Sequence, residues 1–317
     1  MRKIAAAAVL SLAATLAGAA FPEKPIKMVV PFPPGSGTDI VARELAEGMA
    51  RDLKQPVVID NKGGAQGIIG MTTATSSPAD GYTIVILGVT TGASNVSMYR
   101  KLPYDPIKDL TPIGMIADSP IVLVGGPKVQ ANTLEELVKY GRANPGRLTY
   151  GYGSGSAQVA AARVVSLGKF EALPVAYKGS PQALVDVMSG QVDFMFVDLS
   201  VAVTQLAAGK VKAYGVSTKQ RFPQAPQIPS IHEAGLPGYD ISVWFGMAAP
   251  AGVPPEIVAR LSQALNAALA SPELAKKFET KGLAVKASTP AEFGAFMKTE
   301  IANWGTMIKE AGIPPQD

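Results

Sequence analysis

Short apolar runs alternate with stretches of helical periodicity along most of the chain. Residues 26–30, Ile-Lys-Met-Val-Val, predict a buried strand, whereas residues 38–53 place apolar side chains three or four positions apart and predict an amphipathic helix. The first series continues with strands at 57–59, 82–87 and 111–117 and a weaker helix at 67–76. This alternation is typical of βαβ units around a parallel sheet.

A second series of the same kind begins at residue 121. It predicts strands at 121–124, 148–152, 172–176, 192–197, 211–216 and 241–249, and helices at 134–142, 157–167, 181–189 and 201–208. The last three helices, at 256–270, 273–281 and 290–311, have no strands of their own. We therefore predict that they return to the first sheet, with residues 121–124 and 241–249 crossing between two domains. The expected fold is α/β, with two lobes that are each a mainly parallel sheet flanked by helices. Residues 21–120 plus 245–317 would form the first lobe and 121–244 the second.

The first twenty residues have the pattern of an export signal. Two basic residues precede a small and apolar run from Ile4 to Leu16, and residues 17–19 are as small as a signal peptidase requires. A membrane anchor is the alternative, but about 13 apolar residues are fewer than the roughly 20 that span a bilayer. We predict a signal peptide over residues 1–20, cleaved near Ala19 or Ala20, and a periplasmic mature protein.

Composition then limits the kind of protein. The chain contains no cysteine, so it has neither disulfides nor the cysteine of a lipid anchor. Removing Arg2 and Lys3 from the 29 basic residues leaves 27 against 25 acidic ones, and this near-balance gives no indication of nucleic-acid binding. A mature chain of about 300 residues can bury roughly three quarters of its unfolded surface, and two domains are expected.

The most informative segment runs from Val30 to Asp39, Val-Pro-Phe-Pro-Pro-Gly-Ser-Gly-Thr-Asp. A strand ends, prolines turn the chain, and Gly35-Ser36-Gly37 leads directly into a helix. The first turn of a helix carries unpaired N–H groups and the positive end of the helix dipole, and glycines let an anion approach them. A simple capped helix start, with Thr38 or Asp39 as the N-cap, is the structural alternative.

A second segment of this kind lies in the other predicted lobe. Residues 149–156, Thr-Tyr-Gly-Tyr-Gly-Ser-Gly-Ser, again lead from a strand into a helix. Ligands of open α/β sheets bind beyond the carboxyl ends of strands, so two such helix starts facing each other would form a cleft for a carboxylate. Asp198 ends another strand, where it either accepts a hydrogen bond from the ligand or orients a neighbouring N–H. Phe32, Tyr177 and Trp244 are candidates for apolar walls, with the core as their alternative place.

The common signatures of catalysis and of phosphate or metal binding are missing from the sequence. It has no G-x-x-x-x-G-K-[ST] loop, no complete G-x-G-x-x-G and no G-x-S-x-G. His232 is the only histidine, and without cysteines it offers no tight zinc site. We therefore predict no cofactor, no metal and no enzymatic activity. The alternative is an enzyme on the same scaffold that uses Asp39 or Asp198 as an acid or base.

Several segments together resemble one family. Residues 25–39 are similar to the opening of the Bug (TctC-like) solute receptors of tripartite tricarboxylate transport systems, and residues 56–65 to their next signature. Residues 78–83, 104–106 and 229–230 match further motifs in the same order, so the resemblance covers nearly all of the mature chain. One common variant of the family has three glycines where this chain reads Gly35-Ser36-Gly37.

The resemblance implies a periplasmic binding protein of the Venus-flytrap type, with two crossing strands as its hinge. Such a receptor captures a small carboxylate (an organic acid, a dicarboxylate or an aromatic acid such as terephthalate) and passes it to the membrane permease of a tripartite tricarboxylate transporter. A ligand-loaded sensor partner of a membrane kinase is the alternative, and a monomer is expected. Carried over, the ligand-binding residues are Phe32, Pro33, Gly35, Ser36, Gly37, Thr38, Thr90, Gly153, Ser154, Gly155, Ser156, Gln158 and Asp198. Tyr177, proposed above as an apolar wall, completes the predicted set. Because neither loop contains lysine or arginine, neutral donors would hold the anion.

Overall fold

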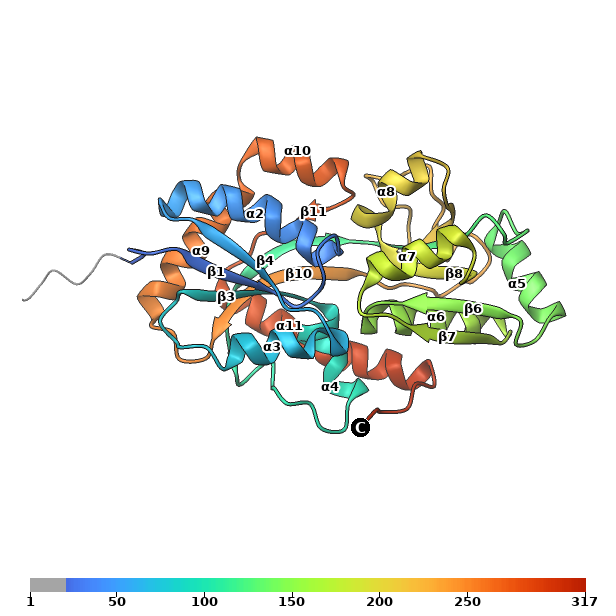
Figure 1. The fold of residues 1–317 in the computed structure, drawn as a ribbon, viewed down its shortest axis with the longest axis horizontal. Helices are drawn as coiled ribbons and strands as arrows, with labels where there is room; N and C mark the ends of the chain where they lie inside the picture. Colours follow the sequence, from blue (N-terminus) through green and yellow to red (C-terminus); the bar gives the residue numbers. More distant parts are fainter. Residues whose placement is uncertain (1–20) are drawn as a thin grey trace, which may run out of the picture.

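Two α/β lobes, each built around its own β-sheet, lie side by side along the long axis of the molecule (Figure 1). The computed structural model describes residues 21–317, so the predicted signal peptide lies outside the described residues. The first sheet has the strand order β11-β4-β10-β3-β1-β2, and the second has the order β7-β6-β8-β5-β9. The predicted two-lobe α/β fold is confirmed.

The elements around the first sheet form the first lobe, and those around the second sheet form the second lobe. The strands of the first lobe are β1 (Ile26–Val30), β2 (Val57–Asn61), β3 (Thr83–Gly88), β4 (Leu110–Ser119), β10 (Val243–Pro250) and β11 (Ala284–Val285). Its helices are α2 (Gly37–Leu53), α3 (Ile68–Thr75), α4 (Asn95–Met98), α9 (Pro255–Leu269), α10 (Pro272–Thr280) and α11 (Pro290–Glu310), with the short helical turns η1 (Ala65–Gly67) and η2 (Thr90–Ser94). The strands of the second lobe are β5 (Ile121–Gly125), β6 (Leu148–Tyr152), β7 (Ala172–Ala176), β8 (Phe194–Asp198) and β9 (Lys212–Val216). Its helices are α5 (Leu134–Ala143), α6 (Gly155–Gly168), α7 (Ser180–Ser189) and α8 (Leu199–Ala207).

Both sheets are mixed, which refines the expectation of mainly parallel sheets. In the first lobe β1 is parallel to β2 and β3, whereas β10 is antiparallel to β3 and β4. In the second lobe β6 is parallel to β7 and β8, whereas β5 is antiparallel to β8 and β9. The parallel pairs join strands of the predicted βαβ units. The antiparallel pairs arise because β5 and β10, which adjoin the links between the lobes, run against these units.

The crossings between the lobes are two short links, not the whole strands that the sequence predicted. Within the described chain, residues 121–124 pair as part of β5 in the second sheet only, and β10 pairs in the first sheet only. The chain crosses at Pro120, between β4 and β5, and again just before Val243. Proline has no N–H to donate to a ladder, so Pro120 separates the pairing of one sheet from that of the other. The predicted domain boundaries stay a prediction.

The first sheet is buried on both faces, which explains its continuous apolar strands. Ile26, Met28 and Val30 of β1 lie in a buried cluster with residues of α2, α9 and α10, whereas Val29 belongs to a second cluster with residues of α3 and α11. The contacts of α9 and α11 with β4 confirm that the last helices return to the first sheet. None of the helices within residues 21–317 is both long and apolar enough to span a membrane.

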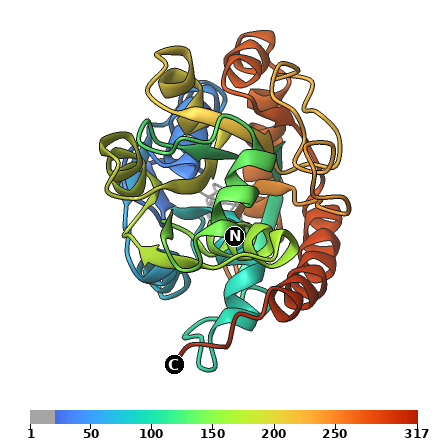
Figure 2. The same cartoon turned by 90° about the vertical axis from the view of Figure 1, so that its right-hand side faces the viewer.

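One hydrophobic core continues from the first lobe into the second. Leu87 of β3 belongs to the same buried cluster as Phe196 of β8. Helix α11 packs on β4 and reaches α6 of the second lobe, where Arg163 donates a hydrogen bond of 3.1 Å to Glu310. Figure 2, which looks from the second-lobe end, shows α11 along one side of the molecule. The lobes therefore share apolar packing on the side of α11.

A fully buried serine ties the two links together. The hydroxyl of Ser217 accepts a hydrogen bond from the N–H of Ile121 (3.1 Å) and donates one to the carbonyl of Ile241 (2.7 Å). The backbone N–H of Ile241 in turn donates to the carbonyl of Ser217 (2.8 Å). Ser217 therefore satisfies backbone groups from both segments that connect the lobes, and we infer that it holds them in a fixed relation.

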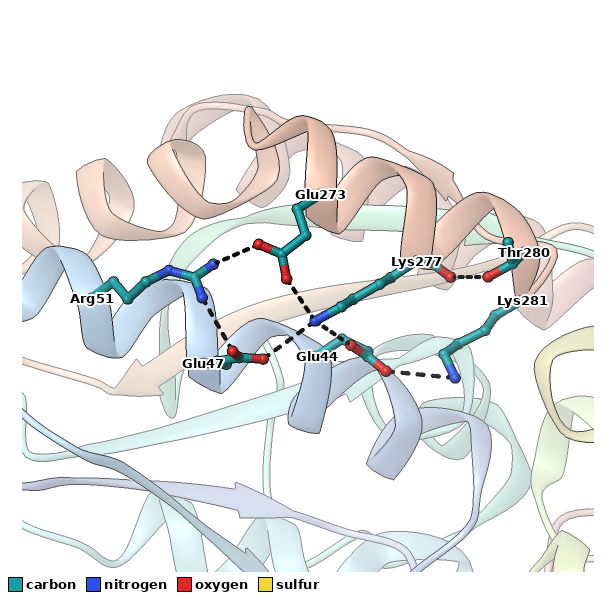
Figure 3. Close-up of polar contacts among 7 residues, drawn as sticks. All are labelled: Glu44, Glu47, Arg51, Glu273, Lys277, Thr280 and Lys281. Atoms are coloured by element: carbon teal, nitrogen blue, oxygen red, sulfur yellow. Dashed lines mark hydrogen bonds and ion pairs between the residues drawn. The ribbon is translucent and has the colours of Figure 1, made fainter.

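By contrast, a network of exposed and partly exposed charges joins α2 to α10 (Figure 3). Lys277 lies 3.0 Å from Glu273, 3.3 Å from Glu47 and 3.8 Å from Glu44, and Arg51 lies 3.2 Å from Glu47. Water and salt screen such pairs, so each contributes at most about 1 kcal/mol.

Ser217→Ala should lower the free energy of unfolding by about 1–3 kcal/mol, because it leaves a buried N–H and a buried carbonyl without partners. Urea unfolding followed by circular dichroism measures this change. Lys277→Met is the control and should cost less than about 1 kcal/mol. Equal effects of the two substitutions would show that Ser217 does not hold the links.

Candidate ligand-binding site

The carboxyl ends of strands from both lobes meet around a cavity of about 30 Å³. Seven of the predicted ligand-binding residues line it: Phe32, Ser36, Thr38, Thr90, Ser154, Ser156 and Asp198. The other lining residues are Gly88, Val89, Ser180, Val243, Trp244 and Phe245. A cavity of this size holds one or two water molecules. The structure is therefore closed, and the lobes must separate before a larger solute can enter.

The start of α2 supplies backbone donors from the first lobe. Ser36 is the N-cap, and its hydroxyl accepts a hydrogen bond of 3.3 Å from the N–H of Asp39. The structural alternative, in which Thr38 or Asp39 caps this helix, was wrong about the cap, because the helix begins at Gly37 and both residues lie within its first turn. Gly35 precedes the cap with a φ of +81°, a conformation that favours glycine.

Asp39 stabilises the loop before α2 through hydrogen bonds to its carboxylate. Its carboxylate accepts hydrogen bonds from the N–H of Gly35 (2.9 Å), from Arg43 (2.8 Å) and from Asn61 (2.8 Å). Burial alone would raise the pKa of Asp39, but these three hydrogen bonds bring it below its usual value. Asn61 also donates to the carbonyl of Phe32 (3.0 Å). Asp39 is thus an ionised, structural residue that fixes the Gly-Ser-Gly turn, which argues against a role as acid or base.

The start of α6 supplies the donors of the second lobe. Ser154 is its N-cap and accepts a hydrogen bond of 3.3 Å from the N–H of Ala157. The N–H of Ser156 donates across the interface to the hydroxyl of Thr90 (3.2 Å), and the two hydroxyls lie 3.2 Å apart. The side chain of Thr90, in the first lobe, thus accepts a hydrogen bond from the first turn of α6, in the second lobe.

Asp198 makes the reciprocal contact at the start of α2. Its carboxylate packs against the start of the helix, since a Cβ added at Gly37 would lie only 2.5 Å from the carboxylate oxygen Oδ2. Burial raises the pKa of Asp198 to about 6, although the nearby backbone N–H groups of Gly37 and of Asp198 itself act in the opposite direction. In this closed structure, each helix start is therefore occupied by an acceptor from the opposite lobe.

Other predicted residues lie near this centre without lining the cavity. A Cβ added at Gly153 would overlap the backbone of Gly179, and one added at Gly155 would lie 2.9 Å from Gln66, Ser94 and Met98. These two glycines allow close packing, as does Gly37. Pro33 packs against Gly63 and Gly179, and Gly35 faces Pro181. Pro33 and Gly35 therefore lie where the lobes touch.

Tyr177 and Gln158 have partners outside the cavity. The Tyr177 hydroxyl donates to Asp186 (2.6 Å), and burial together with this carboxylate raises the pKa of Tyr177 to about 12. Gln158 accepts a hydrogen bond of 3.2 Å from Gln66 of the first lobe. The structure brings Gln158 to the interface between the lobes and leaves Tyr177 within the second lobe.

The sequence reasoning missed two features of the interface. Ser180 lines the cavity at the start of α7, and its signal was a third strand-to-helix turn, Lys178-Gly179-Ser180. Gln66 bridges to Gln158 from a loop in which residues 64–67 all have positive φ angles. Glycines at 63, 64 and 67 marked this loop as unusual, but nothing in the pattern indicated that Gln66 would reach the second lobe.

The chemistry of the cavity is that of neutral donors. Among the residues that the structure describes, those lining it include no lysine or arginine, and apolar side chains such as Phe32 and Trp244 form part of its wall. Across residues 21–317, no three His, Cys, Asp or Glu side chains gather as a metal site would require. The arrangement is suited to binding a small polar solute between the lobes.

Comparisons with known proteins agree with this arrangement and define the class of protein, a periplasmic solute-binding receptor. Residues 41–313 match the family described as "Tripartite tricarboxylate transporter family receptor". Protein BugT of Bordetella pertussis is 32% identical over 308 residues, which is 96% of this chain and 94% of that protein. An R. palustris protein solved with adipate has a TM-score of 0.91 at 33% identity and covers 93% of this chain and 100% of its own. MatC from Rhodopseudomonas palustris, solved with bound malate, has a TM-score of 0.87 at 31% identity and covers 91% and 100%.

The chain therefore belongs to the tripartite tricarboxylate transporter receptor family, as its sequence motifs indicated.

Asp198→Asn should raise stability above pH 6. Because folding raises the pKa of Asp198 from 3.8 to about 6, the folded state binds this proton more tightly, and the contribution of Asp198 falls as pH rises from about 4 to 6. The variant should match the wild type below pH 4 and exceed it by up to about 3 kcal/mol above pH 6. Urea unfolding at pH 4, 5, 6 and 7.5 measures the difference, and a constant difference would contradict the assignment.

Gly155→Ala should hinder full closure, since its methyl group would lie 2.9 Å from the ends of three first-lobe side chains, those of Gln66, Ser94 and Met98, all of which would have to shift. We expect a larger radius of gyration in small-angle scattering, and a closed state weakened by about 1–3 kcal/mol through overpacking. Gly294→Ala in α11 is the control, because the nearest atom there is 3.3 Å away on Pro112. Identical scattering of Gly155→Ala and wild type would disprove the tight contact.

Proposed function

We propose that this protein is a periplasmic receptor that captures a small carboxylate between its two lobes and delivers it to the membrane permease of a tripartite tricarboxylate transporter. The observation that carries the proposal is the opposed pair of helix starts, at α2 and α6, on the two sides of one cavity. Their backbone N–H groups and the hydroxyls of Ser36, Ser154 and Ser156 are donors, which is what a carboxylate requires.

The charges around the cavity support recognition by neutral donors. Backbone N–H groups are fixed by the fold and carry the positive end of the helix dipole, so they bind an anion without a cationic side chain. The relatives solved with adipate and malate are consistent with a carboxylate ligand. Calorimetry against a panel of organic, dicarboxylic and aromatic acids tests the proposal, which fails if none of them binds.

Capture requires a cycle of opening and closing. The cavity in the closed structure is too small for a dicarboxylate, so the ligand must enter an open form and replace the contacts that Asp198 and Thr90 make across the interface. The links near Pro120 and Ile241 are the place for such a motion, with residues 21–120 plus 245–317 moving as one lobe and 121–244 as the other. We further propose that the protein acts as a monomer after its signal peptide has been removed.

Ser154→Asp should weaken carboxylate binding at least a hundredfold, because it places a like charge beside the bound anion. Helix α6 should stay intact, since aspartate is as good an N-cap as serine. Isothermal titration calorimetry with the tightest ligand of the panel measures the loss.

The matched control for this substitution is Thr133→Asp at the N-cap of α5, where Thr133 accepts from the N–H of Glu136 at 3.1 Å. This helix start does not line the cavity, and the variant should bind as the wild type does. Unchanged affinity in Ser154→Asp would show that the start of α6 does not contact the ligand.

A further inference from the structure

Asp198 places a carboxylate inside a cleft whose other polar lining groups are neutral. In the closed structure this carboxylate packs against Gly37 at the start of α2, where an added Cβ would lie 2.5 Å from its Oδ2. A ligand carboxylate that binds at this helix start needs the same first-turn N–H groups. The ligand carboxylate and the Asp198 carboxylate would then lie side by side. Among the described lining residues, no lysine or arginine would neutralise their negative charges.

The surroundings of Asp198 offer few replacement donors. Lining hydroxyls such as those of Ser36 and Thr38 stand at the helix starts, where a ligand anion would engage them. Arg43 is held by Asp39, whose own carboxylate is occupied by Gly35, Arg43 and Asn61. A carboxylate enclosed beside a ligand anion is costly without a donor, so we infer that the ligand itself supplies a donor to Asp198.

We propose that this receptor selects carboxylates that carry a hydroxyl or ammonium group on the carbon next to the carboxylate, and that Asp198 accepts a hydrogen bond from this group. The inference rests on the proposed function and specifies its substrate class. An adjacent hydroxyl or ammonium lies close to a carboxylate held at the start of α2, where it can donate to Asp198. An unsubstituted dicarboxylate offers only acceptors and leaves Asp198 facing a like charge.

The test compares acids that differ only in this group. Calorimetry at pH 7.5, where Asp198 is ionised, is performed with succinate, malate and aspartate, and with glutarate, 2-hydroxyglutarate and glutamate. In at least one of the two length series, wild type should bind a substituted acid at least tenfold more tightly than the unsubstituted one. Asp198→Asn should reduce this ratio to less than about threefold, mainly by binding the unsubstituted acid more tightly, since the like charge has gone.

Asp240→Asn is the control for the loss of one negative charge in the second lobe. Asp240 is exposed and accepts a hydrogen bond from the N–H of Lys219 (3.0 Å), so this variant should keep the wild-type ratio. The inference is overturned if wild type binds the unsubstituted acids as tightly as the substituted ones, or if the preference survives in Asp198→Asn. Either result leaves the proposed function standing. Failure of wild type to bind any acid, here or in the wider panel, would overturn both.

Discussion

Unpaired backbone N–H groups at the beginnings of two helices are the feature on which this structure depends. Each first turn must find acceptors, because donors that are buried alone are costly. In the closed form the opposite lobe provides acceptors there: the carboxylate of Asp198 packs against the start of α2, and the hydroxyl of Thr90 accepts from the N–H of Ser156 in α6. The same requirement underlies the proposed function, in which acceptor groups of a ligand replace these side chains at the two helix starts.

Glycine at the first position of each helix makes this reciprocal contact possible. A side chain at Gly37 would displace Asp198, and one at Gly155 would displace Gln66, Ser94 or Met98. The side of α11 is different, because there the lobes share apolar packing and an ion pair between Arg163 and Glu310. Closure is therefore polar and close-fitting at the cleft, while a continuous apolar cluster joins the lobes elsewhere.

The environment of Asp198 in the cleft bears both on the stability of the folded protein and on the proposed choice of ligand. Asp198 is less stable as an anion in the closed protein than in water, whereas Asp39, a few residues from the same helix start, is stabilised as an anion by three donors. The difference lies in their partners, since Asp39 has Arg43 and Asn61, whereas no lysine or arginine is among the described residues that line the cavity with Asp198. A carboxylate with so little support is suited to accept a donor from a ligand.

Sequence alone determined the order of the main strands and helices, the two-lobe α/β fold, the family and the two Gly-Ser turns, because hydrophobic periodicity and turn residues are local signals. It did not predict the short elements α4 and β11. Of the ligand-binding residues predicted from the sequence, seven line the cavity: Phe32, Ser36, Thr38, Thr90, Ser154, Ser156 and Asp198. Only the tertiary structure decided that Ser36 caps α2, that β5 and β10 each stay within one sheet, that Tyr177 binds Asp186, and that Gln66 meets Gln158. Those outcomes depend on which distant segments pack together, and the contact between Asp198 and Gly37 exists only because the two lobes close on each other.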